Sequence, residues 1–267
     1  MALANIEFFS NCLCRCVTFK AILPTDVNAV DGNGQENPAY QRPMKTLVLL
    51  HGYSAMCSDW IWNSQVMDIA NRYNLCVLLP SGENSFYLDG KETGRKYATF
   101  VGEELLAFAR KTFRLSDKKE DTYIGGFSMG GFGAIHLGLQ FADTFQRIFA
   151  LSSALIMHEV MEMKPGSHNG VANYDYFKLM FGEPEQLADS ENNPEAQIRK
   201  LQEQKKEVPA IYMACGTEDF LLEENRSFAQ FLKEHAVAHV YEESEGNHNY
   251  EFWNRYLEPA VKWMLEK

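Results

Sequence analysis

The sequence contains no apolar run that approaches the roughly 20 residues needed to cross a bilayer as a helix. Its first ten residues, Met1 to Ser10, have neither a basic segment nor an apolar segment after it, so no secretory signal peptide is predicted. The expected location is therefore the cytoplasm, although a chain from which a leader had been removed would look the same. Internal repeats, low-complexity tracts and long charge runs are also missing, which favours one domain over residues 1–267.

Basic residues are few, with 25 Lys and Arg against 36 Asp and Glu and a formal net charge of −11. Such an acidic surface disfavours nucleic acids and anionic membranes as partners. Apolar residues make up 46% of the chain, enough for a sizeable core. These properties indicate a globular protein, but they say little about a small substrate, because the net charge describes the whole surface and not the site.

The six cysteines are an even number, which would allow disulfides, but the chain is long and expected in the cytoplasm, so we expect free thiols. Cys12, Cys14 and Cys16 alternate along a predicted strand over 12–23 and would share one face of it. A metal site would need a further ligand cluster at a matching spacing, and the sequence offers none. We interpret the three as small apolar core residues and predict neither a metal nor another cofactor.

Short continuous apolar runs alternate with segments of helical character, as in an α/β fold with a mostly parallel sheet buried on both faces. The predicted central strands are Thr46–Leu50, Leu75–Leu79, Thr122–Phe127, Ile148–Ser152 and Ala210–Ala214, with a later strand at Val237–Glu242. The predicted helices cover residues 99–113, 129–141, 221–235 and 250–265. A loop rich in turn signals, including Asp31-Gly32-Asn33-Gly34, occupies residues 25–43.

Residues 155–207 interrupt this alternation and are polar, with two predicted helices near 174–181 and 194–206. We interpret them as a small cap insertion over the carboxyl edge of the sheet, where such folds bind ligands. Tyr174, Tyr176 and Phe177 would then form one wall of a pocket; packing among the helices of the insertion is the alternative.

The segment Gly125-Gly126-Phe127-Ser128-Met129-Gly130-Gly131 contains the pattern G-x-S-x-G between a predicted strand and a predicted helix. That setting is typical of the nucleophile elbow of the α/β-hydrolase fold. Glycine at 126 and 130 removes side chains that would collide in so tight a turn. Ser128 is therefore the candidate nucleophile; the alternative is a non-catalytic serine in a glycine-rich turn.

A serine hydroxyl needs a base, and in this fold the chain order is nucleophile, acid, histidine. Of the late histidines, His235 and His239 lie at the end of a helix and the start of a strand, whereas His248 lies in a polar loop after the last strand. His248 is the candidate base; a solvated loop histidine is the alternative.

The acid should follow an earlier strand, and Asp219 comes directly after the strand that ends at Cys215-Gly216. There it could orient His248, or cap the helix that follows, or do both. Glu218 is the adjacent rival. For the oxyanion, the sequence predicts two backbone N–H donors, those of Met129 and of Tyr53 after Gly52. His51 is interpreted as a structural hydrogen-bonding residue.

Taken together, these motifs resemble the esterase D-like putative esterase family, most closely its short bacterial tributyrin esterases. The matching residues are Leu49-Leu50-His51-Gly52-Tyr53, Asp59-Trp60, Gly126-Phe127-Ser128-Met129-Gly130-Gly131, Cys215-Gly216-Thr217-Glu218-Asp219 and Gly246-Asn247-His248. They follow the family's order and spacing over nearly the whole chain. Cys12, Cys14 and Cys16 match no motif of the family.

The resemblance implies a serine esterase that hydrolyses short acyl esters with Ser128, Asp219 and His248 as its triad. The same broad family includes S-formylglutathione hydrolases, feruloyl and acetylxylan esterases, and mycolyl transferases, so thioester hydrolysis and acyl transfer stay open. Relatives are often oligomers, which implies that this chain could form a homo-oligomer.

Overall fold

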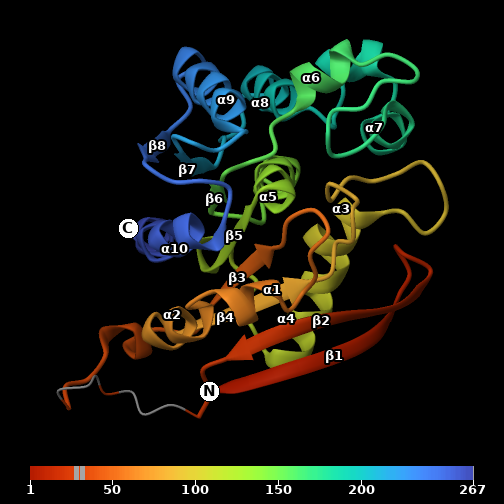
Figure 1. Ribbon diagram of the computed structural model, residues 1–267. Coiled ribbons are helices and arrows are strands. Elements are labelled where there is room, and N and C mark those ends of the chain that lie inside the picture. Colours follow the sequence, from red (N-terminus) through yellow and green to blue (C-terminus); the bar gives the residue numbers. More distant parts are fainter. Residues whose placement is uncertain (27–29, 31–33, 267) are drawn as a thin grey trace.

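Eight strands form one sheet in the order β1-β2-β4-β3-β5-β6-β7-β8 (Figure 1). The computed structural model describes residues 1–26, 30 and 34–266. The strands are β1 (Ala2–Ser10), β2 (Arg15–Leu23), β3 (Lys45–Leu50), β4 (Leu75–Pro80), β5 (Thr122–Phe127), β6 (Arg147–Leu151), β7 (Ala210–Gly216) and β8 (His239–Ser244). From β4 to β8 the neighbouring strands are parallel, whereas β1 and β2 are antiparallel to their neighbours. The mostly parallel sheet was predicted, and the five central strands lie within two residues of their expected bounds.

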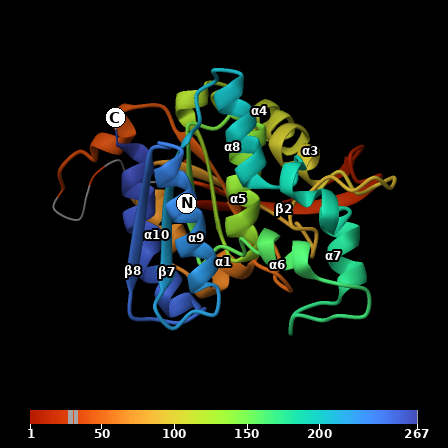
Figure 2. The ribbon, with the colours of Figure 1, turned by 90° about the horizontal axis from the view of Figure 1, so that it is seen from above.

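Helices cover both faces of the sheet. The α-helices are α1 (Asp59–Asn63), α2 (Val66–Arg72), α3 (Tyr97–Thr99), α4 (Leu106–Phe113), α5 (Met129–Gln140), α6 (Met157–Glu162), α7 (Tyr174–Phe181), α8 (Pro194–Glu203), α9 (Leu222–Glu234) and α10 (Tyr250–Leu265). A π-helix, η2 (Phe100–Leu105), joins α3 to α4, and short 3₁₀ helices are η1 (Pro38–Gln41), η3 (Lys119–Asp121) and η4 (Pro184–Asp189). Seen from above, α10 lies on one side of α5, whereas α6 and α7 lie on the other side (Figure 2).

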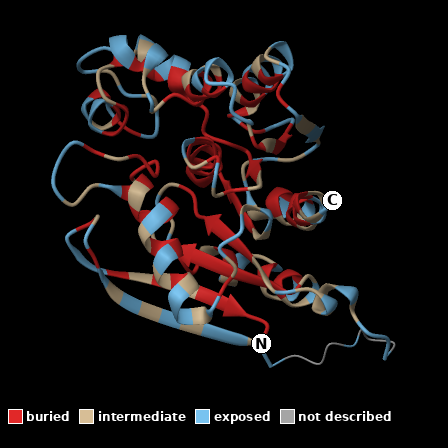
Figure 3. Ribbon diagram, turned by 180° about the vertical axis from the view of Figure 1, so that it is seen from behind, coloured by how far each residue is buried: buried red, intermediate tan, exposed pale blue. Residues whose placement is uncertain are grey.

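Successive side chains of a strand point to opposite faces of the sheet, so the core consists of two clusters, one on each face. On β3, Val48 and Leu50 join the cluster that includes α4, α5 and α9, whereas Leu47 and Leu49 join the one that includes α1, α2 and α10. The central strands are therefore buried on both faces (Figure 3). This explains why their sequences are continuously apolar rather than alternating.

The N-terminal strand was predicted incorrectly. The chain forms a hairpin in which β1 pairs with β2 along its whole length, and a turn occupies residues 11–14. Residues 2–10 do carry the signal of an edge strand, because Ala4, Ile6 and Phe8 pack on the core while the residues between them face outward. The predicted strand over 12–23 therefore begins too early, and the structure starts it at Arg15.

The interpretation of three cysteines as core residues is wrong for two of them. Cys14 lies in the turn with a φ of 51° and is exposed, and Cys16, on β2, is exposed as well. Of these three cysteines, Cys12 alone packs partly against the core. Burial together with the nearby Glu104 carboxylate raises the pKa of its thiol to about 11. All six cysteines are free thiols, as expected.

Most of the remaining segments follow the prediction. The four predicted helices correspond to α3–η2–α4, α5, α9 and α10, and the two in residues 155–207 correspond to α7 and α8. The structure adds α6 and η4 to that insertion and α1 and α2 before β4. Of the predicted turn at Asp31-Gly32-Asn33-Gly34, only Gly34 belongs to the described residues. Within those residues, every helix is too short or too polar to cross a membrane.

Candidate active site

Ser128 sits at the junction between β5 and α5 with strained backbone angles, φ 55° and ψ −123°. Hydrogen bonds hold this conformation: the Ser128 N–H donates to the Leu151 carbonyl at 2.9 Å, and the Ser128 carbonyl accepts from the Ala154 N–H at 3.0 Å. A non-glycine residue at positive φ costs free energy and persists only where its surroundings impose it. The turn therefore lifts the hydroxyl of Ser128 out of the sheet, as predicted for a nucleophile elbow.

Two glycines make the turn sterically possible. A Cβ at Gly126 would lie 2.4 Å from the Gly130 carbonyl oxygen, and a Cβ at Gly130 would lie 2.5 Å from the Leu50 carbonyl oxygen. Both obstacles are backbone atoms, which cannot move aside as a side chain can. The close approach of α5 to the sheet thus offsets the low helix propensity of its glycines.

His248 lies in the loop between β8 and α10, and its ring contacts the other two predicted residues at once. Its Nε2 is 2.9 Å from the Ser128 hydroxyl oxygen, and its Nδ1 is 2.9 and 3.0 Å from the two carboxylate oxygens of Asp219. A carboxylate only accepts hydrogen bonds, so Nδ1 carries the proton. Nε2 is then the nitrogen that accepts the hydrogen bond from Ser128.

Asp219 stays ionised although it is only 6% exposed. Burial alone would raise the pKa of its carboxyl group, but hydrogen bonds outweigh burial and lower that pKa. The donors are His248, the Leu221 N–H at 2.9 Å and the Ser152 hydroxyl. Ser152 in turn accepts from the Trp253 indole N–H at 3.1 Å. The predicted helix cap is not formed, because the N-cap residue of α9 is Leu221 and it has no side-chain cap; Asp219 accepts from the N–H of Leu221 just before the helix begins.

The neighbouring candidates point elsewhere. Glu218 accepts a hydrogen bond from the side chain of Asn247 at 3.0 Å and does not meet His248. The Nδ1 atoms of His235 and His239 contact backbone carbonyls within their own segments. His51 is buried, with its Nε2 accepting from the Gly82 N–H at 2.8 Å, so it has the structural role that was predicted.

The two predicted oxyanion donors, Tyr53 and Met129, line the same cavity as Ser128. Among the residues that the structure describes, neither backbone N–H donates to another group. Gly52, before Tyr53, does not adopt a positive φ; a Cβ there would lie 2.5 Å from the ring of Phe127. Gly52 is thus needed for close packing and not for a left-handed turn.

The cavity at Ser128 has a volume of about 380 Å³ and a largely apolar wall. Phe86 contributes from the loop after β4, and Phe220 covers His248 with a ring-centroid distance of 4.6 Å. Phe177 and Val171 come from residues 155–207. Of the three aromatics predicted for this wall, Phe177 lines the cavity directly, while Tyr176 packs behind it against Tyr53. Tyr174 is not among the lining residues.

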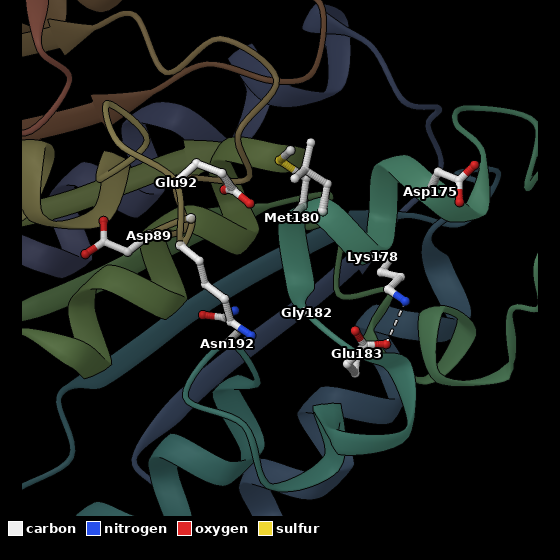
Figure 4. Close-up of a pocket in the computed structure, with 11 residues that line it drawn as sticks. Asp89, Glu92, Asp175, Lys178, Met180, Gly182, Glu183 and Asn192 are labelled. Atoms are coloured by element: carbon white, nitrogen blue, oxygen red, sulfur yellow. Dashed lines mark ion pairs between the residues drawn. The ribbon is translucent and has the colours of Figure 1, made fainter.

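A separate polar hollow lies between the segment around Asp89 and Glu92 and the helix α7 (Figure 4). An ion pair between Lys178 and Glu183 at 2.9 Å lies at its edge. Its lining includes neither Ser128 nor His248, so it plays no part in the candidate site. Across the described part of the chain, no cluster of three His, Cys, Asp or Glu residues could hold a metal ion.

Comparison with known proteins assigns the chain to a family. The model of the "Putative esterase" family matches residues 34–264. The chain belongs to this family. This esterase is 43% identical to an acetyl esterase of Caldicellulosiruptor saccharolyticus over 264 residues, which is 99% of this chain and 98% of the relative.

Two solved structures from Staphylococcus aureus superpose on the whole esterase. Fluorophosphonate-binding serine hydrolase F has a TM-score of 0.84 at 25% identity, covering 100% of this chain and 99% of its own. An S-formylglutathione hydrolase has a TM-score of 0.81 at 25% identity, with both chains fully covered. The fold is that of the α/β-hydrolases, and the enzyme is a serine hydrolase of carboxylic esters.

Proposed function

We propose that this esterase hydrolyses short-chain acyl or aryl esters at Ser128 through a covalent acyl-enzyme, with His248 as general base and Asp219 as its orienting acid. The observation that carries the proposal is the continuous chain of hydrogen bonds from Ser128 to His248 to Asp219, each about 2.9 Å long. No other described side chain lies between the three.

In the first half-reaction, His248 takes the proton of the Ser128 hydroxyl as its oxygen attacks the ester carbonyl carbon. The carbonyl oxygen becomes an oxyanion, which the free N–H groups of Tyr53 and Met129 stabilise. The intermediate collapses when the imidazolium gives its proton to the leaving alcohol. Ser128 then carries the acyl group as an ester, and Asp219 has stabilised the imidazolium without taking its proton.

In the second half-reaction, a water molecule gives its proton to His248 and attacks the acyl carbonyl carbon. The second intermediate collapses to release the acid, and the proton returns from His248 to Ser128. These steps require no cofactor. The volume of the cavity, about 380 Å³, favours a small ester substrate, and so does the 43% identity to an acetyl esterase.

A thioesterase acting on S-formylglutathione is the second candidate, because the solved hydrolase of that name superposes over the full chain. Feruloyl or acetylxylan ester hydrolysis and acyl transfer use the same chemistry on other substrates. The distinction depends on what the cavity accepts and not on the residues that react.

The test is a substrate panel on purified protein and on a Ser128→Ala variant. It contains p-nitrophenyl esters from acetate to octanoate, methyl hydroxycinnamates and S-formylglutathione, with an alcohol acceptor in parallel reactions. We expect the highest kcat/KM on the short acyl esters and a loss of kcat on the order of 10⁴-fold or more in Ser128→Ala. A Ser128→Ala variant that keeps its activity would refute the proposal, and a preference for S-formylglutathione would favour the second candidate.

A further inference from the structure

The N–H of Tyr53 lies in a loop after β3 in which the peptide groups on both sides of the Tyr53 Cα are held by hydrogen bonds. Before Tyr53, the Gly52 carbonyl accepts from the Nδ1 of His51 at 2.8 Å. That nitrogen carries the proton, because the Nε2 of the same ring accepts from the Gly82 N–H. In a trans peptide the N–H points away from the carbonyl oxygen, so the Tyr53 N–H points away from the ring of His51.

The peptide group after Tyr53 is held by Asn84. The side-chain Oδ1 of Asn84 accepts from the Ser54 N–H at 2.8 Å. Ser54 has a φ of 62°, a backbone conformation that a serine keeps only where its surroundings impose it. The hydrogen bond to Asn84 acts directly on this strained residue, so Asn84 constrains the course of the chain immediately after the donor.

Asn84 is itself fixed from the side of the cap. Its backbone carbonyl accepts from the hydroxyl of Tyr176, on α7, at 2.6 Å. The ring of Tyr176 also contacts the ring of Tyr53, with a centroid distance of 5.8 Å. A second contact anchors the same segment to the loop, because the hydroxyl of Tyr87 donates to the His51 carbonyl at 3.0 Å. Asn84 is therefore a fixed point against which the loop that carries Tyr53 is held.

We propose that Asn84 is a positioning residue of this esterase, whose side chain keeps the Tyr53 N–H aimed at the oxyanion by holding Ser54. The proposal rests on the function proposed above, because it takes Tyr53 as an oxyanion donor. Asn84 does not line the cavity, so it acts through the backbone of the loop. Water could replace it as an acceptor for Ser54 but would not fix the loop, and a donor that is not held in place stabilises the oxyanion less.

The experiment compares variants of Asn84 that remove or keep the acceptor. Asn84→Leu has a similar volume and Asn84→Ala a smaller one, and neither side chain can accept a hydrogen bond. Asn84→Asp keeps an acceptor oxygen at the equivalent position. Asn37→Leu is the control, because Asn37 is also half-buried and its Oδ1 also accepts from a backbone N–H, that of Ala39 at 3.0 Å, in a segment that does not line the cavity.

On p-nitrophenyl acetate, Asn84→Leu and Asn84→Ala should lower kcat and kcat/KM alike, on the order of tenfold, with KM nearly unchanged. That is the loss expected when one hydrogen bond made in the transition state is weakened. Asn84→Asp should recover most of the loss, and Asn37→Leu should keep the kcat of wild type.

A pair of ketone inhibitors tests whether the weakened contact is the one to the oxyanion. With a short-chain trifluoromethyl ketone, the Ser128 oxygen adds to the carbonyl carbon, the Ser128 proton passes to His248, and the carbonyl oxygen becomes an oxyanion. The methyl ketone of the same chain length binds without this addition. In Asn84→Leu, the inhibition constant of the trifluoromethyl ketone should rise by the factor by which kcat/KM falls, and that of the methyl ketone should stay unchanged.

Three results would overturn the inference: wild-type kcat in both Asn84→Leu and Asn84→Ala, an equal weakening of both ketones, or an Asn84→Asp variant as impaired as Asn84→Leu. Each leaves the proposed function intact as long as Ser128→Ala abolishes hydrolysis. Activity that survives Ser128→Ala would instead refute the proposed function.

Discussion

At the scale of single residues, the candidate site depends on a carboxylate that is buried and still ionised. Asp219 is held by three kinds of donor, an imidazole, a backbone amide and a serine hydroxyl, which lower the pKa of its carboxyl group despite burial. An ionised Asp219 fixes the proton of His248 on Nδ1 and leaves Nε2 facing Ser128. The tautomer of the base is therefore set by its partner on the side away from the serine.

This arrangement predicts opposite outcomes for two adjacent substitutions. Asp219→Asn keeps the volume but presents an amide that favours the wrong tautomer of His248; the same change in a serine protease costs about 10⁴-fold. We expect a loss of kcat of similar kind, with little change in melting temperature. Glu218→Gln should cost less than about tenfold, because the hydrogen bond of the Glu218 side chain goes to Asn247 and not to His248. Steady-state kinetics on p-nitrophenyl acetate measure both losses. A large loss of kcat in Glu218→Gln together with a small loss in Asp219→Asn would contradict the assignment.

The sequence predicted the residues that meet but not all those that hold them. G-x-S-x-G, the chain order and the position after a strand led to Ser128 and His248 and narrowed the acid to Asp219 or Glu218, and the family resemblance favoured Asp219. Ser152 and Trp253 carry no motif; the fold brings Ser152, just after β6, to Asp219, and brings Trp253, on α10, to Ser152. Phe220 is likewise an ordinary loop residue until the structure places its ring on His248.

At the scale of elements, the insertion over residues 155–207 supplies part of the cavity wall. Ile156, Glu159, Asn169, Val171 and Phe177 all line it. The sequence predicted this region as a break in the strand–helix alternation, which is a strong signal. The prediction missed β1, because the alternating pattern of this half-exposed edge strand is weak beside the continuous apolar runs of the central strands.

We propose that the insertion acts as a cap and sets acyl preference. Val171 lines the cavity and is 48% exposed, so Val171→Ala should remove contact with a longer acyl chain without disturbing the core. The ratio of kcat/KM for p-nitrophenyl butanoate over acetate should fall on the order of tenfold. Leu179→Ala is the control, since Leu179 is 45% exposed on α7 but lies outside this cavity. A uniform loss on both esters in Val171→Ala would indicate altered folding instead.

At the scale of the whole molecule, buried histidines link stability to pH. His136 on α5 is 2% exposed, and its Nδ1 has no hydrogen-bond partner among the described residues. Burial lowers the pKa of its imidazole to about 4, although the negative charge of Asp89 acts to raise it. Burial lowers the pKa of His51 as well. Both rings are therefore neutral in the folded protein at neutral pH.

The consequence has a definite sign. An unfolded histidine has a pKa of about 6.5, so between about pH 6.5 and 4 the unfolded chain binds a proton at His136 that the folded chain does not. The free energy of unfolding should fall as the pH falls through this window. At about 1.36 kcal/mol per pKa unit, the contribution of His136 between pH 7 and pH 5 is roughly 2 kcal/mol.

Urea unfolding at pH 7 and pH 5 tests this link. His136→Leu should lose roughly 2 kcal/mol less between the two pH values than wild type does. His168→Gln, which replaces an exposed histidine, should lose as much as wild type. A His136→Leu variant with the pH dependence of wild type would show that His136 is not the linked group.

The account as a whole depends on Ser128 being the nucleophile, and a covalent adduct tests that directly. After incubation with a fluorophosphonate probe, peptide mass spectrometry should locate one adduct on Ser128, and Ser128→Ala should take up no label. Ser153→Ala should still be labelled, because Ser153 is a buried neighbour that does not line the cavity. An adduct on any other serine, or labelling that survives Ser128→Ala, would contradict the account.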